Sequence, residues 1–185
     1  TLELPPYRRP QIGKVIVRSI FDRTLFVLGR AATVAIPAGI LLWITANITI
    51  GDMTLLSYCA GFLDPLGRLM GLDGVILIAF ILGFPANEIV LPIIIMAYTA
   101  SGSLSEIGNL DAIRELFVAN GWTWLTAACT MLFSLMHWPC STTLLTIKHE
   151  TGSIKWTLLS AVIPTVIGMA LCIIVASVTR LIGLV

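Results

Sequence analysis

Charged side chains are scarce in this sequence. Only 11% of its 185 residues are Asp, Glu, Lys or Arg, whereas 57% are hydrophobic and the mean hydropathy is +0.98. Soluble domains carry about 25% charged residues, so this composition argues against a soluble protein and predicts an integral membrane protein. A net charge of +1 leaves no basic excess, and we therefore expect no nucleic-acid partner.

Short motifs of metal and redox chemistry are also missing. The four cysteines (Cys59, Cys129, Cys140 and Cys172) share no CxxC spacing, and neither an HExxH pair nor an EF-hand loop occurs. Disulfides are not expected, and the cysteines within apolar runs are interpreted as small buried residues. The first residues lack the apolar core of a signal peptide. The chain does not begin with Met, and we expect it to be a piece of a longer protein.

The first 28 residues are predicted to form a separate unit at the membrane surface. Residues 3–10 are an extended, proline-rich lead. Residues 11–28 place apolar side chains on one helical face and Lys14, Arg18 and Asp22 on the other. This pattern is typical of a basic amphipathic helix in the membrane interface, with a plain linker helix as the alternative.

The remaining residues, 29–185, are predicted to form an all-α, polytopic transmembrane bundle. Spans need about 20 apolar residues, and small-xxx-small spacings would allow close helix packing. The expected segments are a span over 31–50, a re-entrant or interfacial segment over 55–70 broken at Asp64-Pro65, interrupted spans over 74–100 and 122–147, a polar connection with a short amphipathic helix over 101–121, and a final span over 156–184.

Basic residues predict the orientation. Six Lys or Arg side chains precede the first span, so its N-terminal side is expected to be cytoplasmic. Four crossings result if residues 55–70 are re-entrant, and five if they cross. Lys148 and Lys155 favour five, because that number places their link on the cytoplasmic side.

Two apolar runs are interrupted in the same way. GFPANE (83–88) and HWPCST (137–142) each place an aromatic residue and a proline, Pro85 or Pro139, before polar side chains. Proline removes a backbone donor and frees carbonyl groups. At membrane depth such groups must be buried in protein or line a wet cavity. Paired interruptions point to a transporter's binding site, so we expect two hairpin-like broken helices that meet near the middle of the membrane and gate a polar path.

The polar residues of these breaks are candidate cation ligands. Glu88 lies in an apolar run, where a carboxylate costs at least about 2.5 kcal/mol. Cys140 and His137 offer a thiolate and an imidazole, which suit Fe²⁺ or Zn²⁺, and Asn87 and Thr142 add polar oxygen. Structural alternatives remain open. Glu88 can be neutralised, His137 can pack beside Trp138, and Cys140 can be a small residue at a helix break.

Three stretches carry a family resemblance. They are LELPPYRRP (2–10), LGFPANEIVLPIIIMAY (82–98) and PCSTTLLTIKHETGSIKW (139–156). In these stretches and their spacing the chain resembles the C-terminal membrane portion of the FeoB ferrous iron transporters. The resemblance extends over nearly the whole chain.

The resemblance implies a function and several partners. FeoB-like proteins import Fe²⁺ across the bacterial inner membrane, and they carry a cytoplasmic GTP-binding domain and two gate regions. This chain resembles the second gate region, in which Cys140 would contact iron or gate its passage. It contains no GxxxxGK[ST], so GTP and Mg²⁺ are expected only in a domain outside it. We accordingly expect no enzyme activity or resident cofactor here. The expected partners are lipid, that GTPase, the first gate region and a possible second copy of the chain.

Three other functions stay open. A nucleoside-type or other organic-solute carrier would use the amide and hydroxyl groups of Asn87, Ser141, Thr142 and Thr143 rather than the thiol. A non-transporting assembly protein would neutralise Glu88 in a packed interface. An intramembrane enzyme built on Ser141 and His137 lacks an evident acid or oxyanion arrangement.

Overall fold

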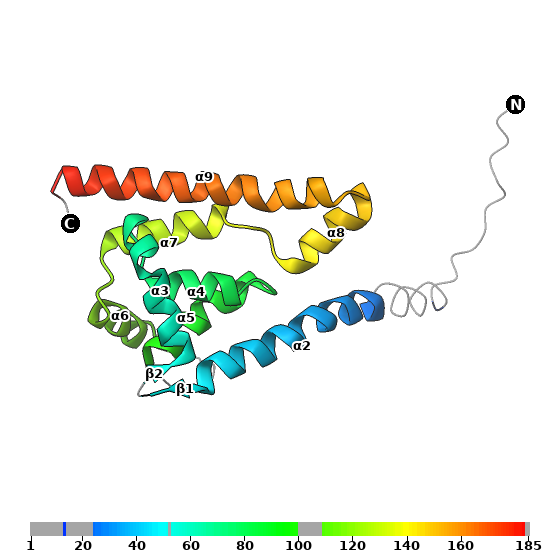
Figure 1. The fold of residues 1–185 in the computed structure, drawn as a ribbon, viewed down its shortest axis with the longest axis horizontal. Helices are drawn as coiled ribbons and strands as arrows, with labels where there is room; N and C mark the ends of the chain where they lie inside the picture. Colours follow the sequence, from blue (N-terminus) through cyan, green and yellow to red (C-terminus); the bar gives the residue numbers. More distant parts are fainter. Residues whose placement is uncertain (1–12, 14–23, 52, 100–108, 184–185) are drawn as a thin grey trace, which may run out of the picture.

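The structure is a computed structural model that describes Gly13 and residues 24–51, 53–99 and 109–183. The predicted surface helix over residues 11–28 falls mostly outside this part, so that helix and the division at residue 29 stay predictions. The described chain is almost entirely helical (Figure 1), which confirms the all-α class. The one exception is a two-stranded antiparallel hairpin that pairs Thr49 with Thr54.

The elements follow one another with short connections. In chain order they are α2 (Phe26–Asn47), β1 (Thr49–Ile50), β2 (Met53–Thr54), α3 (Leu55–Leu69), α4 (Gly74–Leu82), the 3-10 helix η2 (Asn87–Ile89), α5 (Val90–Thr99), α6 (Leu110–Ala119), α7 (Trp124–Met136), α8 (Ser141–Thr151) and α9 (Ile154–Leu181). In the view of Figure 1 the two long helices, α2 and α9, lie on opposite sides of the shorter ones.

By length and composition, one helix within the described ranges is able to cross a membrane alone. This helix is α9, which matches the expected final span. Two bent helix pairs raise the number to three if each pair is one span. The expected span over 31–50 falls on α2, whose clearly apolar part, Ala35–Asn47, is shorter. Large apolar side chains such as Ile36, Trp43 and Ile174 are exposed along α2 and α9, as expected of helices that face lipid.

The expected break at Asp64-Pro65 is wrong, because α3 runs unbroken from Leu55 to Leu69 with Pro65 inside it. Proline forfeits one backbone hydrogen bond, and the local contacts of Asp64 help to offset this loss. One carboxylate oxygen of Asp64 lies 2.6 Å from Arg68 Nε, and the other accepts from the Gly74 N–H at 3.2 Å. The chain turns later, at Gly71, whose φ of 74° favours glycine.

Helices α3 and α4 meet at 111° and pack closely. A Cβ on Gly74 would lie 1.8 Å from the carbonyl oxygen of Ala60, and one on Gly67 would lie 2.7 Å from the Asp73 carbonyl carbon. Only glycine lets the two backbones approach this far. This contact places α4 in the centre of the hydrophobic core, where Ile76 and Ala79 are fully buried.

Residues 74–99, within the stretch expected to be an interrupted, hairpin-like span, fold back on themselves as a helical hairpin. Helices α4 and α5 have 9 and 10 residues, or about 15 Å each, which is half the thickness of the hydrocarbon layer. The two helices pack on each other. Their outer ends are joined by a hydrogen bond from the Tyr98 hydroxyl to Asp73, and Trp122 Nε1 donates to the same Tyr98 oxygen at 2.8 Å. We call this unit the α4–α5 hairpin.

We expect Gly74→Ala to lower the free energy of unfolding by about 3 kcal/mol or more, because the added methyl group meets rigid backbone. The matched control is Gly61→Ala, at an exposed glycine within α3, where a Cβ meets nothing within 4 Å. It should be neutral or stabilising by up to about 1 kcal/mol. Thermal unfolding of the two variants in detergent checks this, and equal stabilities would contradict the close-packing argument.

Candidate functional site

Helices end at both predicted breaks. Helix α4 ends at Leu82, and α5 begins at Val90 after a turn and η2. Helix α7 ends at Met136, and α8 begins at Ser141. Gly83 is required at the first break, because a Cβ there would lie 2.5 Å from Val90 Cγ2. Each break leaves carbonyl groups of a preceding helix without their usual i+4 donors.

The two breaks touch each other through Ser141. Its backbone N–H donates to the Phe84 carbonyl oxygen at 3.1 Å, and its hydroxyl donates to the Pro85 carbonyl oxygen at 3.4 Å. Ser141 is only 4% exposed. Carbonyl groups freed at the first break are thus satisfied by donors of the second. The breaks, which were expected to meet, are in direct contact.

Cys140 lies beside this contact, at the N-cap of α8. Its sulfur lies 3.2 Å from Thr142 Oγ1 and 3.1 Å from Thr143 Oγ1, and the side chain is partly exposed. Hydroxyl donors and the free N–H groups of a helix N-terminus stabilise negative charge. The surroundings of Cys140 therefore suit a thiolate, which is the form that binds metal.

His137 is buried among aromatic rings. It is 7% exposed, and its ring centroid lies 4.9 Å from that of Phe80 and 5.8 Å from that of Trp138. Nδ1 lies 2.9 Å from the Ser134 carbonyl oxygen, which favours a proton on Nδ1. Nε2 is then the nitrogen that remains for a metal. These surroundings fit the alternative in which His137 packs beside Trp138. If the ring binds a metal, it can do so only through Nε2.

Asn87 and Glu88 lie in η2, at the tip of the α4–α5 hairpin, and both are exposed. No ion pair or hydrogen bond joins the Glu88 side chain to another residue of the described ranges. A carboxylate that faces lipid is costly. The tip must therefore face water or another part of the protein.

The predicted ligands do not form a preassembled cage. Among the residues that the structure describes, no three His, Cys, Asp or Glu side chains are grouped so that they could hold a metal ion. The fold brings the Cys140 sulfur to the hydroxyls of Thr142 and Thr143. It brings Ser141, the next residue in the chain, to the carbonyl groups of Phe84 and Pro85. From the sequence, Ser141 was considered for its hydroxyl, in a solute carrier or an intramembrane enzyme, and not for its backbone N–H. Its position two residues after Pro139, where a new helix begins, was the signal for a backbone N–H without a partner inside that helix.

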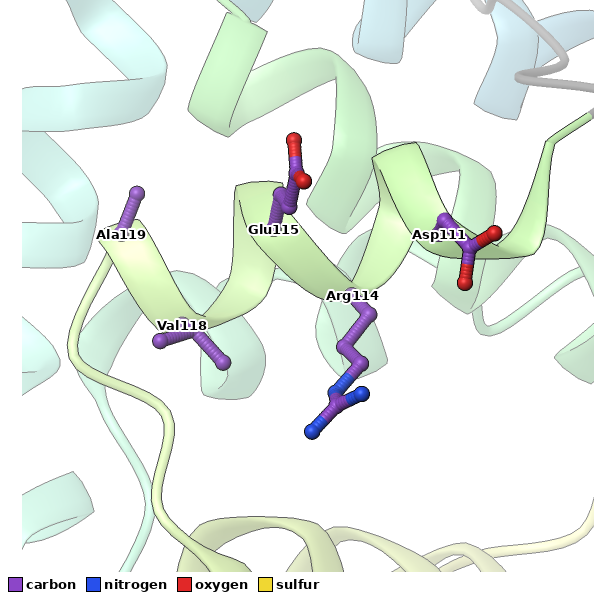
Figure 2. Close-up of a pocket in the computed structure, with 5 residues that line it drawn as sticks. All are labelled: Asp111, Arg114, Glu115, Val118 and Ala119. Atoms are coloured by element: carbon purple, nitrogen blue, oxygen red, sulfur yellow. The ribbon is translucent and has the colours of Figure 1, made fainter.

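Two hollows lie away from the breaks. One, of about 680 Å³, runs along α6 and is lined by Asp111, Arg114, Glu115, Val118 and Ala119. Figure 2 shows Arg114 and Glu115 pointing to opposite sides of α6, so their charges do not converge. The other, of about 360 Å³, lies at the base of the α4–α5 hairpin and includes Asp73 and Tyr98. Neither hollow is lined by a predicted site residue.

Comparison with known proteins gives a consistent result. Residues 28–154 match the family described as "Gate: Nucleoside recognition". Similar proteins are named "Fe(2+) transporter FeoB". The one from Staphylococcus aureus is 28% identical over 183 residues (94% of this chain, 26% of the relative), and the one from Methanocaldococcus jannaschii is 26% identical over 194 residues (97% and 27%). The chain therefore spans about a quarter of the length of these relatives. No solved structure matches.

We expect His137→Ala to lower the free energy of unfolding by about 2–4 kcal/mol, because it opens a cavity between Phe80 and Trp138. His149, whose side chain is 80% exposed, supplies the control, and His149→Ala should change stability by less than about 0.5 kcal/mol. Chemical unfolding of both variants in detergent tests this. A His137 variant as stable as the control would show that the ring contributes little packing.

Proposed function

We propose that this chain lines part of a path for Fe²⁺ across a membrane. The basis is its family, because the chain belongs to the gate family of nucleoside-recognition domains and to the C-terminal gate region of the FeoB family. One observation supports this most directly. Ser141 joins the two breaks through its hydrogen bonds to the Phe84 and Pro85 carbonyl oxygens, and the residue before it in the chain is Cys140, whose thiol is of the kind that binds metal. Soft and hard ligands are thus combined at an interruption of apolar helices.

The chemistry of such a site suits passage rather than storage. Fe²⁺ would shed part of its water shell against the Cys140 thiolate, while Phe84 and Pro85 carbonyls and the Thr142 hydroxyl replace lost water ligands. A closed tetrahedral site would retain the ion, whereas weak and incomplete binding lets it leave. Pro85 and Pro139 keep the two helices interrupted.

Residues at the hairpin tip would act before the thiol. Glu88 is exposed and carries a negative charge that lowers the electrostatic cost of bringing a divalent cation to the breaks. Asn87, its neighbour in η2, offers an amide oxygen. His137 Nε2 is the remaining candidate ligand, on the α7 side of the second break.

The rest of the parent protein would complete the transporter. The exposed tip needs a facing wall, which the first gate region would provide. A cytoplasmic GTP-binding domain would supply GTP and Mg²⁺ binding and gate the path. The proposed location is the bacterial inner membrane, with several crossings, the N-terminal side in the cytoplasm and a homo-oligomer as one assembly.

A second candidate is a carrier of an organic solute. The description of the matching family, which names nucleoside recognition, favours it. Such a carrier would depend on Asn87, Ser141 and Thr142 and would tolerate the loss of the Cys140 thiol. A non-transporting assembly protein would bind no solute at all.

We expect Co²⁺ to give a thiolate-to-cobalt charge-transfer band with the full-length protein that contains this chain, and Cys140→Ser to abolish it. Oxygen-free absorption spectra measure this directly. Cys59→Ser, at a half-buried cysteine of α3, is the control and should keep the band. If wild type lacks the band, Cys140 is not a ligand, and binding of a nucleoside then separates the organic-solute carrier from the assembly protein.

We expect Glu88→Gln to reduce the initial rate of Fe²⁺ uptake roughly 10-fold, because it removes an attraction of order 1–2 kcal/mol while keeping the side-chain shape. Radioactive iron uptake into proteoliposomes gives the rate. Glu115→Gln, at an exposed position of α6, should leave the rate unchanged. Equal rates for the two variants would remove Glu88 from the path.

A further inference from the structure

Ser141 occupies the carbonyl oxygens that a passing cation would need. Its N–H points at the Phe84 oxygen (3.1 Å), and its hydroxyl lies 3.4 Å from the Pro85 oxygen. A donor hydrogen carries partial positive charge and therefore repels a cation from the same lone pairs. With Ser141 buried at 4% exposure, no water layer separates it from these carbonyls. The described conformation is in this respect closed.

The base of the α4–α5 hairpin is held more firmly than its tip. Asp73 caps α4 by accepting from the Ile76 N–H at 2.6 Å, and it also accepts from the Tyr98 hydroxyl. Trp122, just before α7, donates to Tyr98 and stacks on Phe117 with ring centroids 4.3 Å apart. Hydrogen bonds to a carboxylate are roughly twice as strong as neutral ones.

The tip, in contrast, is held to the second break by two neutral hydrogen bonds from Ser141. The one from the Ser141 hydroxyl to the Pro85 oxygen is long, at 3.4 Å. A displacement of the hairpin would therefore separate Ser141 from Phe84 and Pro85 while the contact of Asp73 with Tyr98 remains. The base acts as the fixed end of the hairpin and the tip as its movable end.

The position of Ser141 in α8 makes this separation inexpensive. Ser141 is the first helical residue after the N-cap, Cys140. The first N–H groups of a helix have no partner within it, so Ser141 can release Phe84 without the loss of any hydrogen bond of α8. Water in the opened path would then satisfy the N–H.

We infer that Ser141 is a positioning residue that keeps the cation path closed, and that the path opens when the hairpin tip leaves it. This inference rests on the proposed function, since it describes regulation of the same site. It assigns Ser141 a role separate from that of Cys140. Cys140 binds the ion, whereas Ser141 competes with the ion for the carbonyl oxygens.

Ser141→Pro tests the inference because it removes the N–H without breaking α8, and its Cδ, in the place of the amide hydrogen, also pushes the Phe84 carbonyl oxygen away. Proline is tolerated at the first position of a helix, and Cys140, with φ −59° and ψ 158°, already has the backbone conformation required before proline. The matched control is Ile154→Pro, at the first position of α9. Ile154 is 70% exposed, and Ser153 before it is extended.

The measurement is Fe²⁺ entry into proteoliposomes that hold the full-length protein, with no nucleotide added. One hydrogen bond changes an equilibrium constant by a factor of about 2–10, so Ser141→Pro should raise the resting rate about 2- to 10-fold. Ile154→Pro should leave it unchanged. Ser141→Ala, which removes only the weaker hydroxyl contact, should raise the rate by about twofold, and it decides the question if the proline variant does not fold.

Resting rates of the folded Ser141 variants at or below that of wild type would overturn the inference. The cobalt band separates this failure from that of the proposed function. If Cys140→Ser abolishes the band while the Ser141 variants leave resting entry unchanged, the metal path stands and the closing role of Ser141 falls. If wild type shows neither band nor Fe²⁺ entry, both fall together.

Discussion

Backbone groups freed inside an apolar environment must find partners within the protein, and this constraint governs the structure around the breaks. An interrupted helix in water is satisfied by solvent, but an interrupted helix in lipid is not. Here the carbonyls of Phe84 and Pro85 are satisfied by Ser141, at the start of another helix. Cys140 directly precedes Ser141 in the chain, so the same backbone hydrogen bonds also fix the position of the residue that carries the thiol.

Close backbone packing makes that contact attainable. Glycine at position 74 lets α4 lie directly on α3, and glycine at position 83 lets the chain turn back towards α5. At the C-terminal end of α7, next to the second break, a Cβ on Gly168 of α9 would lie 2.8 Å from Met136 Cβ. The two breaks are thus carried by helices whose positions are defined to within a methyl group. A small shift of the hairpin tip would therefore change the contact between the two breaks, because the closely packed helices that support them cannot adjust to it.

Sequence patterns predicted the helical class, the places of both breaks and their mutual contact, because proline and polar residues within apolar runs have few physical explanations. They failed at Asp64-Pro65, where an ion pair and tertiary packing retain a helix that local propensity disfavours. Over residues 74–100 the patterns indicated an interrupted, hairpin-like helix, although run length alone cannot tell a span from a hairpin of two half-length helices. The hydrogen bonds from Trp122 to Tyr98 and from Tyr98 to Asp73 could not be predicted from the sequence, because they depend on which helix ends meet in space.

The hydrogen bonds of the hairpin also imply an order of assembly. The contact that closes its base joins residues 25 positions apart, whereas the contact of the two breaks joins residues 56 positions apart. Contacts between residues nearer in sequence require less loop closure and tend to form earlier during folding. The hairpin is then complete before α8 has docked, and Ser141 reaches the carbonyls last. A newly inserted chain would therefore bring its two breaks into contact only after the hairpin that carries one of them has formed.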